Sequence, residues 1–192
     1  MEPGQQGEVQ LRCPSLFSGY TAFSGHQQTS DAGTDHPEAL GPGAVGIDQD
    51  GWLHTGDRGF LQDGELFLTG RLKDLIIVDG ENFAPEDIEW IADSVVQESG
   101  ARHAAFSVSQ EGREGAGLVV EASAERASET GTWRERIGTA VAQRVGLPLK
   151  VIHFVRRGSL PKTSSGKIRR NAVRDAWREG SLVELAKGSD PA

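Results

Sequence analysis

This sequence has little cysteine, and it lacks both a long apolar run and a basic leader segment. Cys13 is the single cysteine among 192 residues, so no disulfide can form within the chain, which suits a reducing compartment. The expected role of Cys13 is that of a small, buried apolar side chain. No apolar run is long enough for a membrane span, and the opening residues, MEPGQQGEVQ, show no secretory signal. We therefore expect a cytoplasmic protein without a membrane span.

Positive charge is also scarce, and its distribution is uneven. The chain has 28 acidic and 20 basic residues, for a net charge of −8, which argues against a nucleic-acid partner. Residues 156–178 reverse this balance, with eight basic residues against the single acidic Asp175. The basic residues are Arg156, Arg157, Lys162, Lys167, Arg169, Arg170, Arg174 and Arg178. Because they surround a Ser/Gly-rich stretch, an anionic ligand such as a nucleotide phosphate is favoured over a merely solvated helix face.

Metal-ligand spacing is missing as well. His26, His36 and His54 are not accompanied by further cysteines or by a regular ligand pattern, so they are interpreted as exposed loop histidines and no metal site is predicted. Residues 24–50 are rich in Gly, Pro, Ser and Asp and lack hydrophobic periodicity. This composition predicts a mobile loop.

The N-terminal third contains signals for strands. Val9 and Leu11 alternate with polar residues before Pro14, which predicts a short edge strand. The apolar pairs on either side of Asp63 and Gly64 predict a β-hairpin, because an Asp-Gly pair supplies the positive φ angles of a tight turn. Residues 75–78, LIIV, form a continuous apolar run and predict a short strand buried on both faces.

The remainder alternates between helix and strand patterns. Pro85 opens a helix whose first turn carries Glu86, Asp87 and Glu89, and which Gly100 ends. Strands are predicted at 104–108, 117–122 and 151–155, and further helices at 129–145 and from Lys167 to roughly Leu185. This order predicts an α+β fold, in which helices cover a small three-stranded sheet next to a β-hairpin.

Two motifs carry most of the functional information. One is GRLKDLIIVDGENFAPEDIE at 70–89, and the other is LPKTSSGKIRR at 160–170. Together they resemble the adenylate-forming superfamily of acyl-CoA synthetases, luciferases and nonribosomal adenylation domains, and most closely the fatty acyl-AMP ligases. The resemblance runs from about Gly7 to Ala186 and covers only the end of such an enzyme. The second motif lacks the GxxxxGK spacing of a P-loop.

The resemblance implies roles for four residues. Asp57, in Thr55-Gly56-Asp57, would hold the adenosine ribose hydroxyls, and Arg71 would bind ribose or phosphate oxygens through its planar fork. Lys73 would be the pivot between two rigid bodies. Lys167 would insert between the substrate carboxylate and the α-phosphate of ATP, where negative charge develops during adenylation.

The same resemblance implies a domain division and partners. Residues 1–70 would be the remnant of a β-rich N-terminal domain, and 71–192 the swinging C-terminal lid. The phosphate loop, adenine pocket and acyl tunnel of the family have no counterpart here, so ATP and Mg²⁺ would be held mainly by a separate N-terminal chain. The acid, fatty or otherwise, would pass to a carrier-protein thiol or to coenzyme A. Two alternatives remain open, namely a non-catalytic docking or regulatory module and a piece of one longer enzyme.

Two positions depart from the family pattern. Ile77 stands where some acyl-CoA-forming relatives carry a second lysine, which argues against a luciferase-like oxidation. Asp79 stands where acyl-AMP ligases often have a basic residue, which weakens the assignment to one subfamily.

Overall fold

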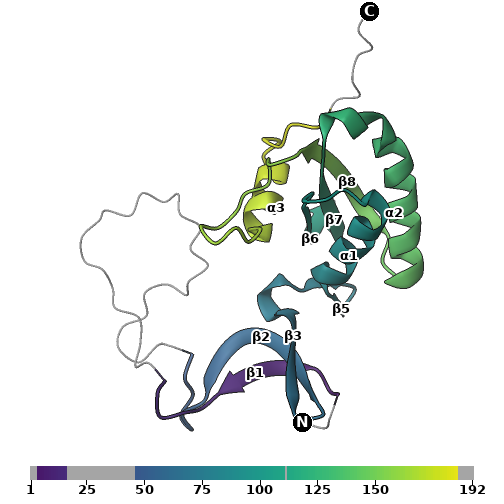
Figure 1. Ribbon diagram of the computed structural model, residues 1–192. Helices are drawn as coiled ribbons and strands as arrows, with labels where there is room; N and C mark the ends of the chain where they lie inside the picture. The colour runs from purple at the N-terminus through teal and green to yellow at the C-terminus, as the bar shows by residue number, and fades with distance from the viewer. Residues whose placement is uncertain (1–3, 17–45, 111, 186–192) are drawn as a thin grey trace, which may run out of the picture. The chain divides into compact units, whose positions relative to one another are not determined.

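The computed structural model describes residues 4–16, 46–110 and 112–185. The chain divides into two compact units, Met1–Lys73 and Asp74–Ala192 (Figure 1). This division falls at residue 73, whereas the sequence places the boundary after residue 70. That 1–70 and 71–192 act as two functionally distinct domains stays a prediction.

The first unit is an antiparallel sheet. Its strands are β1 (Gly7–Leu11), β2 (Leu53–Gln62) and β3 (Glu65–Arg71), in the order β1-β2-β3. Asp63 and Gly64 join β2 to β3 with φ angles of 52° and 82°, as the predicted hairpin requires. β1 is an edge strand, also as predicted. The hairpin extends further than the sequence signals, up to the pairing of Asp57 with Arg71.

Residues just before β2 form an ordered turn. Asp48 Oδ1 accepts hydrogen bonds from the backbone N–H groups of Asp50 and Trp52, each at 2.9 Å, and Ile47 bridges to Leu53. The end of the predicted mobile loop is therefore fixed by local side-chain bonds of the kind that Asp makes at turns. Residues 24–45 of that loop, with His26 and His36, lie outside the described residues, so their mobility stays a prediction.

The expectation of a buried Cys13 is wrong. The thiol is exposed and lies 3.3 Å from the Ser15 hydroxyl, because the chain has already left β1 for a turn at Pro14. A hydrogen bond with Ser15 lowers the pKa of Cys13 from its ordinary value. No role follows from this contact alone.

A second hairpin follows the junction. The short 3₁₀ helix η1 (Leu72–Asp74) leads into β4 (Ile76–Val78), which pairs with β5 (Glu81–Phe83), a strand that the sequence analysis did not anticipate. Burial of the LIIV run on both faces is a wrong prediction, because Ile76 is buried while Ile77 is 50% exposed. The run belongs to a two-stranded hairpin and not to the centre of a larger sheet.

The main sheet of the second unit matches the predicted fold class. It consists of β6 (His103–Gln110), β7 (Arg113–Ala122) and β8 (Leu149–Arg156), in the order β6-β7-β8. β6 and β7 are antiparallel, whereas β7 and β8 are parallel. A parallel pair needs a crossover connection, which η2 (Ala124–Glu129) and α2 (Thr130–Arg144) provide.

Helices cover both faces of this sheet (Figure 1). α1 (Pro85–Val96) and α2 pack on one face, where the core includes Ile88, Leu118, Ile137 and Phe154. α3 (Arg170–Arg178) covers the other face, where Val173 and Trp177 meet Phe106 and Val119. α1 ends before the predicted stop at Gly100, because Gln97 takes a left-handed conformation with φ 50°.

The last helix is shorter than predicted at both ends. Ile168 forms a bridge with Lys162, so the chain around Lys167 is extended and helix begins only at Arg170. After Arg178, Gly180 has φ 70°, and Leu185 N–H donates to the Phe154 carbonyl at 2.7 Å. Residues after α3 therefore lie along β8 instead of continuing the helix.

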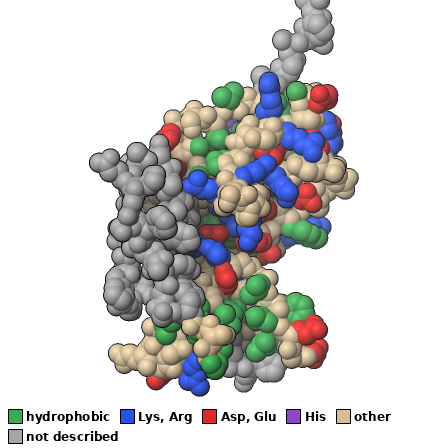
Figure 2. Space-filling view, turned by 60° about the vertical axis from the view of Figure 1, so that its left-hand side comes forward, with side chains coloured by type: hydrophobic (Ala, Val, Ile, Leu, Met, Phe, Trp, Pro, Cys, Tyr) green, Lys and Arg blue, Asp and Glu red, His purple; other side chains and the backbone are tan. Residues whose placement is uncertain are grey.

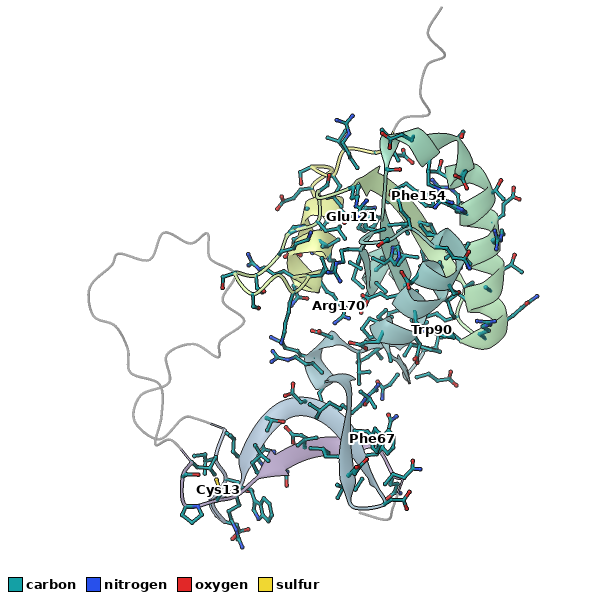
Figure 3. The ribbon with its side chains drawn as sticks, in the orientation of Figure 1. Cys13, Phe67, Trp90, Glu121, Phe154 and Arg170 are labelled. Carbon is teal, nitrogen blue, oxygen red and sulfur yellow. The ribbon has the colours of Figure 1, made fainter. Side chains whose placement is uncertain are left out.

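A carboxylate lies inside the sheet. Glu121, in β7, is fully buried, and its Oε1 accepts hydrogen bonds from the backbone N–H groups of Gly158 and Leu160 at 2.9 and 3.0 Å (Figure 3). These bonds fix the reversal of the chain after β8. The sequence analysis had assigned Glu121 no role.

We expect Glu121→Ala to reduce the free energy of unfolding by about 2–4 kcal/mol, because two buried N–H groups lose their acceptor. Glu121→Gln should cost less, since its amide oxygen can replace Oε1. Chemical denaturation with each variant measures both changes. Equal stability of Glu121→Ala and the parent would show that water satisfies these N–H groups equally well.

Candidate functional site

Lys167 lies on a compact turn of the second unit. The turn spans residues 161–169, between β8 and α3, and Lys167 is exposed at its end. Ser164, Ser165 and Gly166 form the tip, and Gly166 has φ 81°. Because small residues let a backbone approach a ligand closely, the main chain next to Lys167 is accessible to a ligand.

Hydrogen bonds hold this turn in one shape. Thr163 N–H donates to the Lys167 carbonyl at 2.8 Å, and Gly166 N–H donates to the Thr163 carbonyl at 2.9 Å. The Thr163 hydroxyl accepts from Lys167 N–H at 3.1 Å, and Arg169 N–H donates to the Pro161 carbonyl at 3.0 Å. The backbone that carries Lys167 is therefore preorganised, while its side chain extends into solvent.

Asp57 and Arg71 meet in the first unit. Strand pairing places them opposite each other, and Arg71 Nε donates to Asp57 Oδ1 at 3.0 Å. Their side chains are 34% and 54% exposed. The structure thus joins two residues that the sequence predicted separately, and it forms a carboxylate and a guanidinium group that a polar ligand can reach.

The backbone before Asp57 is fixed from β1. Thr55 Oγ1 donates to the Val9 carbonyl at 2.6 Å and accepts from Asp57 N–H at 3.0 Å. Glu8 Oε1 accepts from Gly56 N–H at 3.1 Å. Both neighbours of Asp57 on its N-terminal side therefore have bonds to β1, which limits how far the carboxylate can move.

Glu8 also contacts His54. His54 Nδ1 donates to Glu8 Oε2 at 2.7 Å, and Nε2 lies 3.4 Å from Asp48 Oδ2. The hydrogen bond to Glu8 raises the pKa of His54 from its ordinary value, with a smaller contribution from Asp48. The same bond lowers the pKa of Glu8. His54 is therefore part of an ion-pair cluster and not simply an exposed loop histidine.

Lys73 is the last residue of the first unit and lies within η1. Its predicted role as a pivot is not tested by its position in one conformation. The roles of Asp57, Arg71 and Lys167 in ligand binding likewise stay predictions.

The basic stretch at 156–178 serves more than one purpose. Arg170 is bound to three carboxylates within the chain, Arg157 donates to the Ser99 carbonyl, and Arg174 pairs with Asp175. These three arginines thus bind groups of the protein itself, and an anionic ligand for the basic stretch stays a prediction.

Two residues that position the site were not predicted from the sequence. Glu121 was assigned to an apolar strand, although a carboxylate within such a strand is itself a sign of a buried hydrogen-bonded group. Glu89 was assigned to the helix dipole, yet it accepts hydrogen bonds from Ala105 N–H and Arg170.

Among the described residues, no cluster of three or more His, Cys, Asp or Glu side chains could hold a metal ion. The helices of the same residues are too short or too polar to cross a bilayer.

The cluster around His54 predicts a pH dependence. The raised pKa of His54 means that the pair adds stability below the unfolded value of about 6.5 and loses it as the pH rises through the folded value. The pKa of Glu8 is lowered in the folded state. The pair therefore also weakens as the pH falls through this folded pKa of Glu8. We expect Glu8→Gln to return the His54 pKa towards 6.5, as followed by NMR titration of the ring protons.

Asp48→Asn is the matched control, because Asp48 lies further from the ring. It should lower the His54 pKa less than Glu8→Gln does. An unchanged pKa in Glu8→Gln would contradict the assigned contact.

Comparisons with known proteins place the chain among ligases. No family model matches it. It is 34% identical over 178 residues to a putative acyl-CoA synthetase of Caulobacter vibrioides, covering 91% of this chain and 28% of that protein. It is 35% identical over 190 residues to the medium-chain-fatty-acid–[acyl-carrier-protein] ligase JamA of Moorena producens, covering 94% of this chain and 30% of that protein.

A solved structure gives the same assignment. The adenylation, ketoreductase and pseudo-Asub multidomain structure of a keto acid-selecting nonribosomal peptide synthetase module superposes with a TM-score of 0.68 at 33% identity. The match covers 95% of this chain and 14% of that one. The chain spans about a third or less of the proteins that it matches. It belongs to the adenylate-forming superfamily of acyl-CoA synthetases, fatty-acid ligases and adenylation domains, and corresponds to their C-terminal part.

Proposed function

We propose that this chain is the C-terminal lid portion of an ATP-dependent acyl-AMP ligase. It would work with a separate N-terminal chain that holds most of the ATP and Mg²⁺ contacts and activates a carboxylic acid, most suitably a fatty acid, as its acyl adenylate. The acyl group would then pass to a carrier-protein thiol or to coenzyme A. A cytoplasmic location remains the expectation from the cysteine content.

The presentation of Lys167 is the observation that carries this proposal. The residue is exposed at the end of a turn whose backbone is fixed by its own hydrogen bonds. In adenylation, a carboxylate attacks the α-phosphorus and pyrophosphate leaves, so negative charge develops where the two anions meet. A cation on a rigid loop that enters this site would stabilise that charge without reorganisation.

The Asp57–Arg71 pair supports nucleotide binding. A carboxylate can accept hydrogen bonds from both hydroxyls of a ribose, and the ion pair with Arg71 at 3.0 Å keeps Asp57 oriented. In the proposed complex, Asp57 would bind the ribose, and Arg71 would add contacts to ribose or phosphate oxygens. The bound ATP would supply the α-phosphorus and its leaving group, with Mg²⁺ neutralising the phosphates.

Apolar side chains on the first unit support a partner for it. Phe67 stacks on Phe60 with ring centroids 5.1 Å apart, and strand alternation places Leu61, Leu66 and Leu68 on the opposite face. Leu68 is 63% exposed and Phe67 43%. Figure 2 shows such hydrophobic side chains on the surface. A sheet that is apolar on both faces needs cover on both, which an N-terminal adenylation portion would supply.

The names of the relatives support only the chemical class of the acyl acceptor, which is a thiol. One relative is named for a carrier-protein acceptor and another as an acyl-CoA synthetase. Both acceptors present a thiol that attacks the acyl adenylate, so a thioester is the proposed product in either case.

A non-catalytic docking or regulatory module is the alternative function. Such a module would keep the fold of the second unit without needing an exposed lysine, a fixed Asp57 carboxylate and Arg71 together. A longer chain that carries both portions would leave the chemistry unchanged. The rate of catalysis after replacement of Lys167 discriminates between the two functions, because only an enzyme would need this lysine.

We expect Lys167→Ala to slow adenylation about 100- to 1,000-fold, the usual cost of losing one preorganised electrostatic contact. The side chain is exposed, so folding should be little affected. The measurement is pyrophosphate release from ATP and a fatty acid by the chain together with its N-terminal partner. Lys150→Ala, at an exposed lysine of β8 outside the basic stretch 156–178, is the matched control and should leave the rate nearly unchanged.

Thioester formation from synthetic acyl-AMP provides the second readout. It should survive Lys167→Ala, because the lysine acts on a charge that exists only during adenylation. Equal loss of both half-reactions would assign Lys167 to docking, and no loss of either would favour the non-catalytic module.

The junction gives a separate prediction. A lid that pivots would take one pose for adenylation and another for thiol transfer. Lys73→Pro fixes φ at residue 73 and disfavours the helical conformation of Leu72 before it, so the second unit should be held in one of these two poses. We expect one half-reaction to fall much further than the other. Lys73→Ala removes the side chain but keeps backbone freedom, and should affect both only mildly. A folded Lys73→Pro variant with equal losses would rule out the pivot.

A further inference from the structure

Arg170 binds three carboxylates from two other elements. Its Nε and Nη2 donate to Oε1 and Oε2 of Glu89, both at 2.7 Å. Nη1 donates to Asp74 Oδ2 at 3.0 Å, and Nη2 lies 3.0 Å from Glu86 Oε1. The Arg170 side chain is only 21% exposed, and that of Asp74 16%. Figure 3 shows Arg170 extending from the start of α3.

This arrangement is an unusual way to stabilise a helix. A cation at the first residue of α3 opposes the helix dipole, which favours negative charge there. Three carboxylates around one guanidinium also leave an excess of negative charge, and burial raises the pKa of Glu89 although Arg170 and the Ala105 N–H oppose this. Partly buried ion pairs add little net stability, and their best-attested use is to fix how elements align.

The three carboxylates lie next to the junction between the units and at the start of α1. Asp74 directly follows Lys73, at the start of the second unit, while Glu86 and Glu89 lie in the first turns of α1. On the other side, Arg170 follows Arg169, whose N–H closes the base of the Lys167 turn at the Pro161 carbonyl. The guanidinium group therefore connects the base of that turn with the residue next to the junction.

We propose that Arg170 is a positioning residue for adenylation, which holds the Lys167 turn at a fixed place relative to the junction at residues 73 and 74. The inference rests on the proposed function for its catalytic part. When the second unit pivots, the turn moves with the junction and not independently of it. A displacement of about 1 Å at a reacting centre can cost about 100-fold in rate, so a loosened turn should act mainly on adenylation.

Three variants distinguish a positioning role of Arg170 from an effect of its charge and from an effect on folding. Arg170→Met removes the cation and the fork, whereas Arg170→Lys keeps the cation but cannot bind three carboxylates with one planar group. Arg174→Met is the matched control, since Arg174 lies one turn later on α3 and its Nε pairs with the adjacent Asp175. If Arg170→Met does not fold, Arg170→Lys still allows the test.

Hydrogen exchange in the chain alone gives the first readout. In Arg170→Met, the N–H groups of Thr163, Gly166 and Arg169 should exchange at least about 10-fold faster, while the amides of β6 and β7 keep their protection. Arg170→Lys should show an intermediate change, and Arg174→Met none. Unchanged exchange at the turn in both Arg170 variants would overturn the proposal.

A pH profile adds a readout that a simple packing role would not change. Without Arg170, Glu89 stays buried beside Glu86, so its folded pKa should rise further above its unfolded value. The folded state then binds more protons, and stability falls as the pH rises. The loss of thermal midpoint in Arg170→Met should therefore be larger at pH 8 than at pH 5, and a loss independent of pH would contradict the charge network.

Half-reactions with the N-terminal partner complete the test. We expect Arg170→Met to slow pyrophosphate release about 10- to 100-fold and to leave thiol transfer from acyl-AMP nearly unchanged, with partial recovery in Arg170→Lys. A loosened turn with normal adenylation, while Lys167→Ala is impaired, would overturn the positioning role and keep the proposed function. If Lys167→Ala is also fully active, the proposed function fails, and hydrogen exchange still decides whether Arg170 anchors the turn.

Discussion

A buried carboxylate fixes the part of the second unit that carries Lys167. Glu121 lies within β7 and accepts the backbone N–H groups of Gly158 and Leu160, so the chain after β8 turns back at a defined point. Leu160 then enters the core beneath α3, and the following residues form the turn that ends in Lys167. The position of the turn thus depends on a hydrogen-bond acceptor inside the sheet, which ties the chain just before the turn to the buried strand β7.

The two units differ in how completely they bury their apolar surface. The second unit has helices on both faces of its sheet and a core on each side, as an independent body requires. The first unit is a three-stranded sheet that exposes Phe67 and Leu68 on opposite faces. Its strands are held by pairing and by bonds such as that of Thr55 to Val9. One unit is therefore suited to move as a body, and the other to be part of a larger domain.

Sequence patterns predicted most elements of the fold because their signals are local. The Asp63-Gly64 turn, the start of α1 at Pro85 and the helix at 129–145 follow from turn chemistry and periodicity. The errors have longer-range causes. Burial of Ile77 depended on neighbouring strands that β4 lacks, and the start of α3 depended on the bridge between Lys162 and Ile168. At the site, the pairing of Asp57 with Arg71 and the three partners of Arg170 join residues that are distant in sequence, which composition cannot reveal.

The rigidity of the Lys167 turn bears on how a lid could work. A lysine on a flexible loop would lose conformational entropy each time it entered a site, at a cost of roughly 1–2 kcal/mol for each residue that is ordered. Here the bonds of Thr163, Gly166 and Arg169 hold the backbone of the turn before any ligand arrives, and Glu121 fixes the chain just ahead of it at Gly158 and Leu160. If Lys167 enters an active site as proposed, withdrawing it by movement of the entire second unit would keep these bonds intact, whereas refolding the turn would break them. A change of a few dihedral angles at η1 would be the simplest movement that does this, so the proposed mechanism requires a flexible junction together with a rigid turn.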